Sequence, residues 1–231
     1  MEDFSLIVLC RTKSHLLPLT LDGLRLQTGS FEVLVLDGDG GEGASELALR
    51  YPELKLRVQN ASGKSLADMM NLGVHLSCGK YIQFLEPGDR YISQHGLECL
   101  SDLIRTDPHL IYAGSLDRGS MAQIEPVLAK SPWFLRAQVL ELGGFDRKWV
   151  HCPSLDLLCR LFRKRDLRLV FCRRVLMELK KDKPESLREM YRIFYRHFGL
   201  WRALKWAFRQ DHSHTLRRTL SWVKGAFWES Y

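Results

Sequence analysis

Short apolar runs separated by polar, glycine-rich turns recur through the first 180 residues of the chain. Runs of this length are typical of strands that are buried on both faces of a sheet. The predicted strands cover residues 4–10, 31–36, 54–58, 80–85, 110–113 and 169–172. Apolar residues at helical spacing predict helices over residues 16–27, 44–51 and 63–77, and a further helix from just after Asp89 to about Arg105. This alternation predicts an α/β fold, with a mostly parallel sheet flanked by helices.

A different pattern begins at Pro184. Aromatic and aliphatic residues recur there every three or four positions beside a basic stripe of Arg188, Arg192 and Arg196, which is typical of an amphipathic helix. Tryptophans continue this pattern toward the C-terminus. The chain is therefore predicted to consist of a domain over residues 1–179 and a basic, aromatic helical tail over residues 180–231.

Charge divides the chain in the same way. Residues 1–125 hold 11 basic and 17 acidic side chains, whereas residues 180–231 hold 12 basic and 5 acidic ones. The six cysteines lack C-x-x-C spacing, which favours reduced thiols over a disulfide framework or a zinc site. No apolar run approaches the roughly 20 residues that span a bilayer, and Met-Glu-Asp-Phe is no signal peptide, so we expect a cytoplasmic protein.

Acidic side chains follow two of the predicted strands. Glu86 and Asp89 flank a Pro-Gly turn after residues 80–85, and Asp37 and Asp39 begin a glycine-rich turn after residues 31–36. Ligands of open α/β sheets bind at the carboxyl ends of the strands, where carboxylates can hold a divalent cation or accept hydrogen bonds from a ligand. Solvated acidic turns are the alternative. The glycine-rich turn lacks both the dinucleotide fingerprint and Walker spacing.

Four blocks, in order, resemble family 2 glycosyltransferases of the GT-A fold. Leu6–Arg11 is similar to their opening strand and turn, and residues 31–44 resemble "F-E-x-x-V-x-D-G-G-S-x-D-G-T". Residues 67–73 resemble "Y-D-A-M-N-x-G". Residues 79–89 resemble "G-x-Y-I-x-F-L-N-x-G-D", the variant of the D-x-D motif found in one cell-envelope subgroup. Together the blocks cover about 85 residues, so the combination is more specific than any one of them.

The resemblance implies a nucleotide-sugar half over residues 1–90 and an acceptor half over residues 91–179. It also implies a UDP- or GDP-sugar donor and Mn²⁺ or Mg²⁺ as cofactor. The residues that it assigns to the donor are Arg11, Asp37, Asp39, Asp68 and Asn71. Of these, Asp68 and Asn71 lie three positions apart on a predicted helix and therefore face the same way. Glu86 and Asp89 are assigned to the metal, although Gly88 replaces the second acid of the commoner D-x-D motif.

The acceptor half resembles the family up to the catalytic base. Arg136 to Asp146 matches "R-x-x-x-x-x-x-G-G-F-D", but the next block, "E-D-Y-E-L-x-L-R", corresponds to residues 153–160 and places Ser154 at the base. A serine without a partner cannot accept the acceptor proton. Asp156, His151 or another residue then serves as the base, or the activity is lost. Asp156 has a structural alternative as well, an i,i+4 ion pair with Arg160.

The resemblance thus implies transfer of a sugar, with inversion, to a cell-envelope glycan or a lipid-linked acceptor. The alternative is a non-catalytic binding or scaffold protein that has lost the base. For the tail, basic helices with tryptophans favour an anionic membrane surface contacted by residues 184–231. Packing against the domain or in a dimer is the alternative. Nucleic acid is not expected as a partner, because the first half is acidic and carries no nucleic-acid motif.

Overall fold

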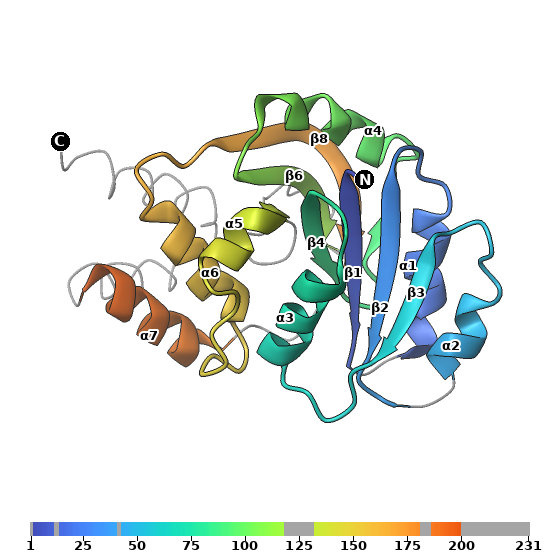
Figure 1. Ribbon diagram of the computed structural model, residues 1–231, viewed down its shortest axis with the longest axis horizontal. Helices are drawn as coiled ribbons and strands as arrows, with labels where there is room; N and C mark the ends of the chain where they lie inside the picture. The colour runs from blue at the N-terminus through green and yellow to red at the C-terminus, as the bar shows by residue number, and fades with distance from the viewer. Residues whose placement is uncertain (1, 12–13, 41–42, 118–131, 181–185, 200–231) are drawn as a thin grey trace.

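The computed structural model describes residues 2–11, 14–40, 43–117, 132–180 and 186–199. Within these ranges, eight strands form one curled sheet (Figure 1). They are β1 (Phe4–Cys10), β2 (Phe31–Asp37), β3 (Leu56–Asn60), β4 (Tyr81–Leu85), β5 (Arg90–Tyr91), β6 (Leu110–Asp117), β7 (Pro132–Leu135) and β8 (Leu169–Leu179).

The order of the strands across the sheet is β3-β2-β1-β4-β7-β6-β8-β5. The first four pair in parallel, as do β6 and β8, whereas β7 runs antiparallel to both of its neighbours and β5 antiparallel to β8. The predicted α/β fold with a mostly parallel sheet is therefore confirmed. The two reversed strands extend the sheet beyond β4, on the side of the predicted acceptor half.

Helices cover both faces of the sheet, and β1 shows why. Its side chains alternate between two apolar cores: Phe4, Leu6 and Val8 belong to one, and Ile7 and Leu9 to the other. The first core is closed by α1 (Leu17–Leu24), α2 (Gly43–Ala48) and α4 (Gly96–Ser101). The second is closed by α3 (Leu66–Leu76), α5 (Arg136–Glu141) and α6 (Pro153–Phe162). Short 3₁₀ turns, η1 (Ser14–Leu16) and η2 (Leu103–Thr106), precede α1 and follow α4.

The prediction of a helix directly after Asp89 is wrong at its start. Residues 90–91 form β5 instead, because Arg90 pairs with Glu178 of β8 (2.6 Å) and Tyr91 is buried, its hydroxyl donating to Gln83 (2.7 Å). Sequence periodicity also missed β7. It ended the last strand at Cys172, whereas β8 continues to Leu179 through a charged stretch with a register shift. The strand pairings of β5, β7 and β8 join residues that are distant in sequence, so local pattern does not predict them.

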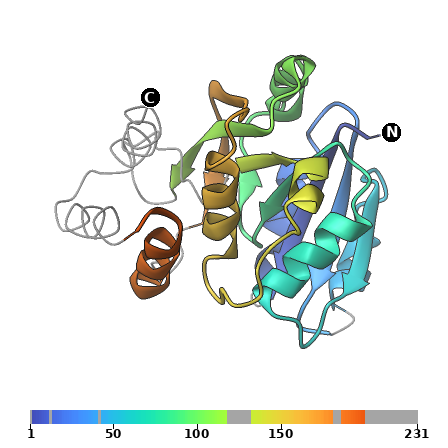
Figure 2. The ribbon, with the colours of Figure 1, turned by 60° about the vertical axis from the view of Figure 1, so that its left-hand side comes forward.

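The tail helix α7 (Leu187–Phe198) packs against α6 (Figures 1 and 2). Ile193 and Phe194 are buried against Cys152, Leu155 and Cys159 in a third small core. Packing on the domain, the alternative interpretation, thus applies to this first part of the tail. The division at residue 179 stays a prediction, and residues 200–231, with all four tryptophans behind the membrane hypothesis, lie outside the described residues. Among the described helices, none is long and apolar enough to cross a membrane.

Candidate functional site

The carboxyl ends of the central parallel strands bring the predicted acidic positions to one edge of the sheet. Cys10 at the end of β1 lies beside Asp37 at the end of β2, and Asp37 in turn pairs with Asn60 of β3. On the other side of β1, β4 ends at Leu85, directly before Glu86. Because β1 separates β2 from β4, their ends lie two strand spacings apart, about 10 Å. One ligand that crosses the end of β1 can reach both.

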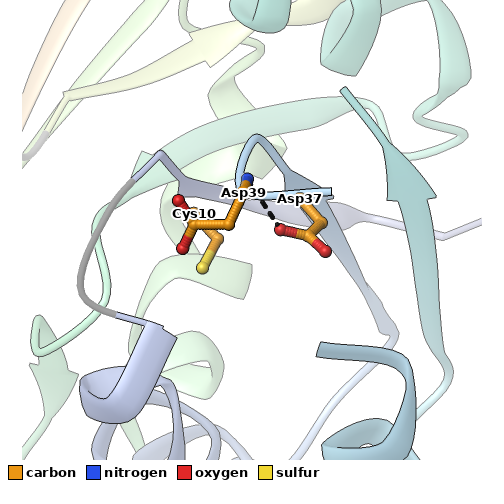
Figure 3. A group of neighbouring side chains, drawn as sticks. All are labelled: Cys10, Asp37 and Asp39. Carbon is orange, nitrogen blue, oxygen red and sulfur yellow. Dashed lines mark hydrogen bonds between the residues drawn. The ribbon is translucent and has the colours of Figure 1, made fainter. Parts of the chain in front are cut away.

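Asp37, Asp39 and Cys10 form a compact group at this edge (Figure 3). Their carboxylate and thiol atoms lie within 4.8 Å of one another, and the Asp39 amide donates to Asp37 Oδ1 (3.0 Å). Gly38 allows the approach, because a Cβ there would lie 3.2 Å from the Cys10 carbonyl oxygen. Sequence reasoning identified both aspartates and missed Cys10, although it ends the strand adjacent to theirs.

The chemistry of this group favours hydrogen-bond acceptance over metal binding. Burial, together with the charges of Asp37 and Asp39, raises the pKa of Cys10 to about 11. At neutral pH the thiol is therefore protonated, and a thiol is a much weaker metal ligand than a thiolate. Two carboxylates remain, which suit the hydroxyl and N–H donors of a ligand. Arg11, which follows β1 directly, is exposed at the same edge.

The Glu86–Asp89 turn is closed by Asp89. Its Oδ2 accepts from the Glu86 amide (3.0 Å) and its Oδ1 from the Lys180 amide (2.8 Å), so the buried carboxylate ties the end of β4 to the end of β8. Gly88 has a positive φ of 102°, and its amide donates to Thr20 Oγ1 (2.9 Å). Asp89 thus has a structural role whether or not it also binds a metal. Glu86 is only half-buried.

A pocket lies beside this turn. Its lining residues are Leu9, Leu66, Met70, Phe84, Leu85, Glu86, Asp89, His151, Cys152, Pro153 and Ser154. The walls therefore come from β1, the β4 turn, α3, and the segment that leads into α6. Ser154, at the position where the resemblance predicts the base, lines the same pocket as the predicted metal residues, and its hydroxyl lies 3.9 Å from the sulfur of Met70.

Asp68 and Asn71 both connect α3 to the loop after α5. Asn71 Nδ2 donates to the Phe145 carbonyl (2.9 Å), its Oδ1 accepts from the Phe145 amide (2.8 Å), and Asp68 pairs with Arg147 (2.6 Å). A hydrogen bond from Ser65, more than the charge of Arg147, lowers the pKa of Asp68. Donor contact by these two residues stays a prediction. Their observed contacts hold the Gly-Gly-Phe-Asp loop in place.

Asp156 forms the i,i+4 ion pair with Arg160 that was the structural alternative to a catalytic role, and it does not line the pocket beside Glu86. Its Oδ2 accepts from Arg160 Nε (2.9 Å) and its Oδ1 contacts His197 Nε2 of α7 (2.8 Å), with the Asp156 and His197 side chains 2% and 5% exposed. Arg160 also donates to the carbonyls of Leu142 and Gly144. Burial alone would raise the pKa of Asp156, but the His197 hydrogen bond and the Arg160 charge outweigh it and lower the pKa.

The role of Asp156 as the catalytic base stays a prediction, and its observed contacts are those of the structural alternative. The carboxylate lines a second pocket, together with Gly143, Gly144, Asp146, Arg160, Arg196 and His197. Both of its oxygens bind cationic or hydrogen-bonding partners, and the lowered pKa makes it a weaker proton acceptor. Asp156 therefore stabilises the packing of α6 and α7 against the Gly-Gly-Phe-Asp loop of residues 143–146.

By sequence, no family model and no curated protein matches the chain. By structure, it is similar to residues 1–349 of TarS from S. aureus, with a TM-score of 0.70 and 14% identity over 84% of this chain and 64% of that one. The same fragment bound to UDP-GlcNAc matches with a TM-score of 0.67, 15% identity, and coverage of 84% and 65%. The mannosyltransferase PcManGT from Pyrobaculum calidifontis, bound to GDP-Man and Mn²⁺, matches with a TM-score of 0.59 and 14% identity, over 84% of this chain and 62% of that one.

The fold is that of a GT-A glycosyltransferase. At this identity the likeness shows the fold alone, and this chain spans less than two thirds of the length of each of these three structures. In the chain itself, the edge with Asp37, Asp39 and Glu86 lies at the carboxyl ends of the parallel strands, where open α/β sheets bind their ligands.

Proposed function

We propose that the chain binds a nucleotide-diphospho-sugar at the carboxyl edge of the β1–β4 sheet and transfers the sugar to a hydroxyl acceptor. The proposal rests on two acidic positions, Asp37 and Glu86, which lie about 10 Å apart at this edge, and on the pocket that adjoins Glu86. The similar structures support it, since one holds UDP-GlcNAc and another GDP-Man with Mn²⁺. The proposed donor is therefore a UDP-sugar or a GDP-sugar.

In this proposal the two acidic positions have different tasks. Asp37 and Asp39, with Arg11 beside them, accept and orient the nucleoside. Glu86 and Asp89 hold Mn²⁺ or Mg²⁺ against the diphosphate. The donor set fits such an ion, because carboxylate oxygens are the ligands that hard divalent cations prefer. The bound cation would stabilise the negative charge of the departing nucleotide.

The acceptor side is defined by the pocket next to Glu86. Attack by an acceptor hydroxyl from this side, opposite the leaving diphosphate, inverts the anomeric centre. We propose a cell-envelope glycan or a lipid-linked saccharide as the acceptor, as the F-L-x-x-G-D block of residues 84–89 suggests. Attachment to an anionic membrane would fall to residues 200–231, since the apolar side of α7 packs on α6. Liposome co-sedimentation should then be lost on deleting residues 200–231.

One observation favours a second candidate, a donor-binding protein without transfer activity. The position of the family's base holds Ser154, and Asp156 is bound by Arg160 and His197. Such a protein would retain the nucleotide edge and bind donor without turnover. The two candidates predict the same donor binding and differ only in release of the nucleotide.

Isothermal titration with UDP-GlcNAc and with GDP-mannose, each with and without Mn²⁺, tests the proposal. We expect binding of at least one donor that strengthens with Mn²⁺, weakens at least tenfold in Asp37→Asn, and loses its Mn²⁺ dependence in Glu86→Gln. Glu98→Gln, on α4 and paired with His95, is the matched control and should bind as wild type. Absence of binding to both donors, or binding unaffected by either edge variant, would contradict it.

A further inference from the structure

The wall of the pocket formed by residues 151–154 contains a side chain suited to accept a proton. Four residues that line the pocket carry titratable groups, namely Glu86, Asp89, His151 and Cys152. Cys152 is buried in the third core, both oxygens of Asp89 accept backbone amides, and Glu86 is the residue proposed for the metal. His151 is exposed at this pocket and follows the glycine loop in sequence. Imidazole is the side chain that accepts protons most readily near neutral pH.

The backbone that carries His151 is held from outside the α/β core. Glu189 of α7 accepts from the His151 amide (2.9 Å) and the Cys152 amide (2.8 Å) through the same oxygen, Oε1. Two further contacts from the end of the helix attach α7 to the domain: His197 binds Asp156 (2.8 Å), and Arg196 reaches Asp146 (3.3 Å). The tail helix thus determines where the segment entering α6 lies.

We propose that His151 is the general base of the transfer and that Glu189 is the residue that positions it. The inference rests on the proposed function. In the step, the acceptor oxygen forms a bond to the anomeric carbon while the bond from that carbon to the diphosphate oxygen breaks. The bonding pair leaves with the nucleotide diphosphate, and the proton of the acceptor hydroxyl passes to the His151 imidazole and then to solvent. His151 thus accepts the proton in place of the carboxylate that the resemblance predicts at position 154, where this chain has Ser154.

Release of nucleotide from UDP-GlcNAc and GDP-mannose, with Mn²⁺ and with water as the acceptor, measures this step. We expect His151→Gln to lower the rate by about 100-fold to about 10,000-fold, with donor Kd within twofold of wild type. Added imidazole should restore part of the rate to His151→Ala. His95→Gln, an exposed histidine on the far side of the sheet next to α4, is the control and should turn over as wild type.

The positioning role of Glu189 predicts a difference between two variants. Glu189→Gln keeps an oxygen that accepts both amides, so its rate should stay within about threefold of wild type. Glu189→Leu removes the acceptor and should lower kcat by about 10-fold to 100-fold with donor Kd unchanged, because a displacement of about 1 Å is enough for such a loss. Equal rates for the two variants would contradict the positioning role.

Chemical labelling gives a readout that does not depend on turnover. Diethyl pyrocarbonate modifies exposed imidazoles, and mass spectrometry follows each histidine separately. UDP-GlcNAc with Mn²⁺ should slow modification of His151 by at least threefold and leave His95 unchanged. Equal modification of His151 with and without a donor that binds would remove it from the site.

The outcomes separate the two proposals. If wild type binds neither donor, both the proposed function and the role of His151 fail. If it binds donor and releases no nucleotide, donor binding stands and the role of His151 fails. If it releases nucleotide and His151→Gln does so equally fast, only the role of His151 fails.

Discussion

The acidic edge of the sheet and the helices beside it use similar polar motif residues in different ways. At the edge, Asp37 ends β2, Asp39 lies just after it and Glu86 directly follows β4, and both strands pair with β1 in parallel. On the helices α3 and α6, by contrast, Asn71 binds backbone atoms of Phe145, and Asp156 binds the side chains of Arg160 and His197. A residue at the end of a parallel strand is placed at the carboxyl edge of the sheet by the topology, whereas a residue on a helix binds whichever neighbour the packing provides.

The largest test of this contrast is Asp156→Ala. It leaves Arg160 and His197 without their carboxylate inside the packed junction of α6 and α7, so the free energy of unfolding should fall by about 3–5 kcal/mol. Urea unfolding measures it. Asp102→Ala, which removes an exposed pair with Arg105, should be close to wild type. A stable Asp156→Ala protein that binds donor and has lost turnover would instead support the catalytic role of Asp156.

The second test separates the two acids of the β4 turn. Asp89→Ala leaves the amides of Glu86 and Lys180 unpaired and should lower the free energy of unfolding by about 2–3 kcal/mol. Glu86→Ala, at a half-buried position, should change stability far less and weaken Mn²⁺-dependent donor binding. If Glu86→Ala is the more destabilised variant, the division between a structural and a ligand-binding acid is wrong.

A smaller effect is expected for Asn71→Ala, which removes both hydrogen bonds to Phe145 and should lower the free energy of unfolding by about 1–2 kcal/mol. Donor affinity should change less than twofold if the side chain serves the glycine loop alone. Gln59→Ala, at an exposed position on β3, is the control for stability. A large loss of donor affinity with unchanged stability would instead assign Asn71 to the donor.

The smallest expected effect is a dependence of the free energy of unfolding on pH. Because the pKa of Asp156 is lowered in the folded state, its carboxylate contributes stability that is fully present above its unfolded pKa, near 3.8, and is lost as pH falls through the folded pKa. The difference in unfolding free energy between wild type and Asp156→Asn should therefore shrink as the pH falls below about pH 4. A difference that grows toward low pH would contradict the direction of the shift.

The strands and the acidic edge could be predicted from sequence because their signals are local. A buried strand is a continuous apolar run, and the residue after it lies at the sheet's edge wherever the strand pairs, so Asp37 and Glu86 could be placed at that edge before their partners were known. The tail helix was predicted for the same reason. Its amphipathic period is visible, whereas the surface that covers its apolar side is not.

The sequence by itself therefore determined six of the eight described strands and the acidic strand ends, and it indicated Ser154 at the position where the resemblance expects the base. Only the tertiary structure decided which polar side chains are bound by the protein itself, since Asp156, Asn71 and Asp89 contact residues 41, 74 and 91 positions away. It also showed that α7 packs on α6 and that Glu189 accepts a hydrogen bond from the His151 amide. Local pattern records what a residue can bind, and the packing of distant segments decides what it does bind.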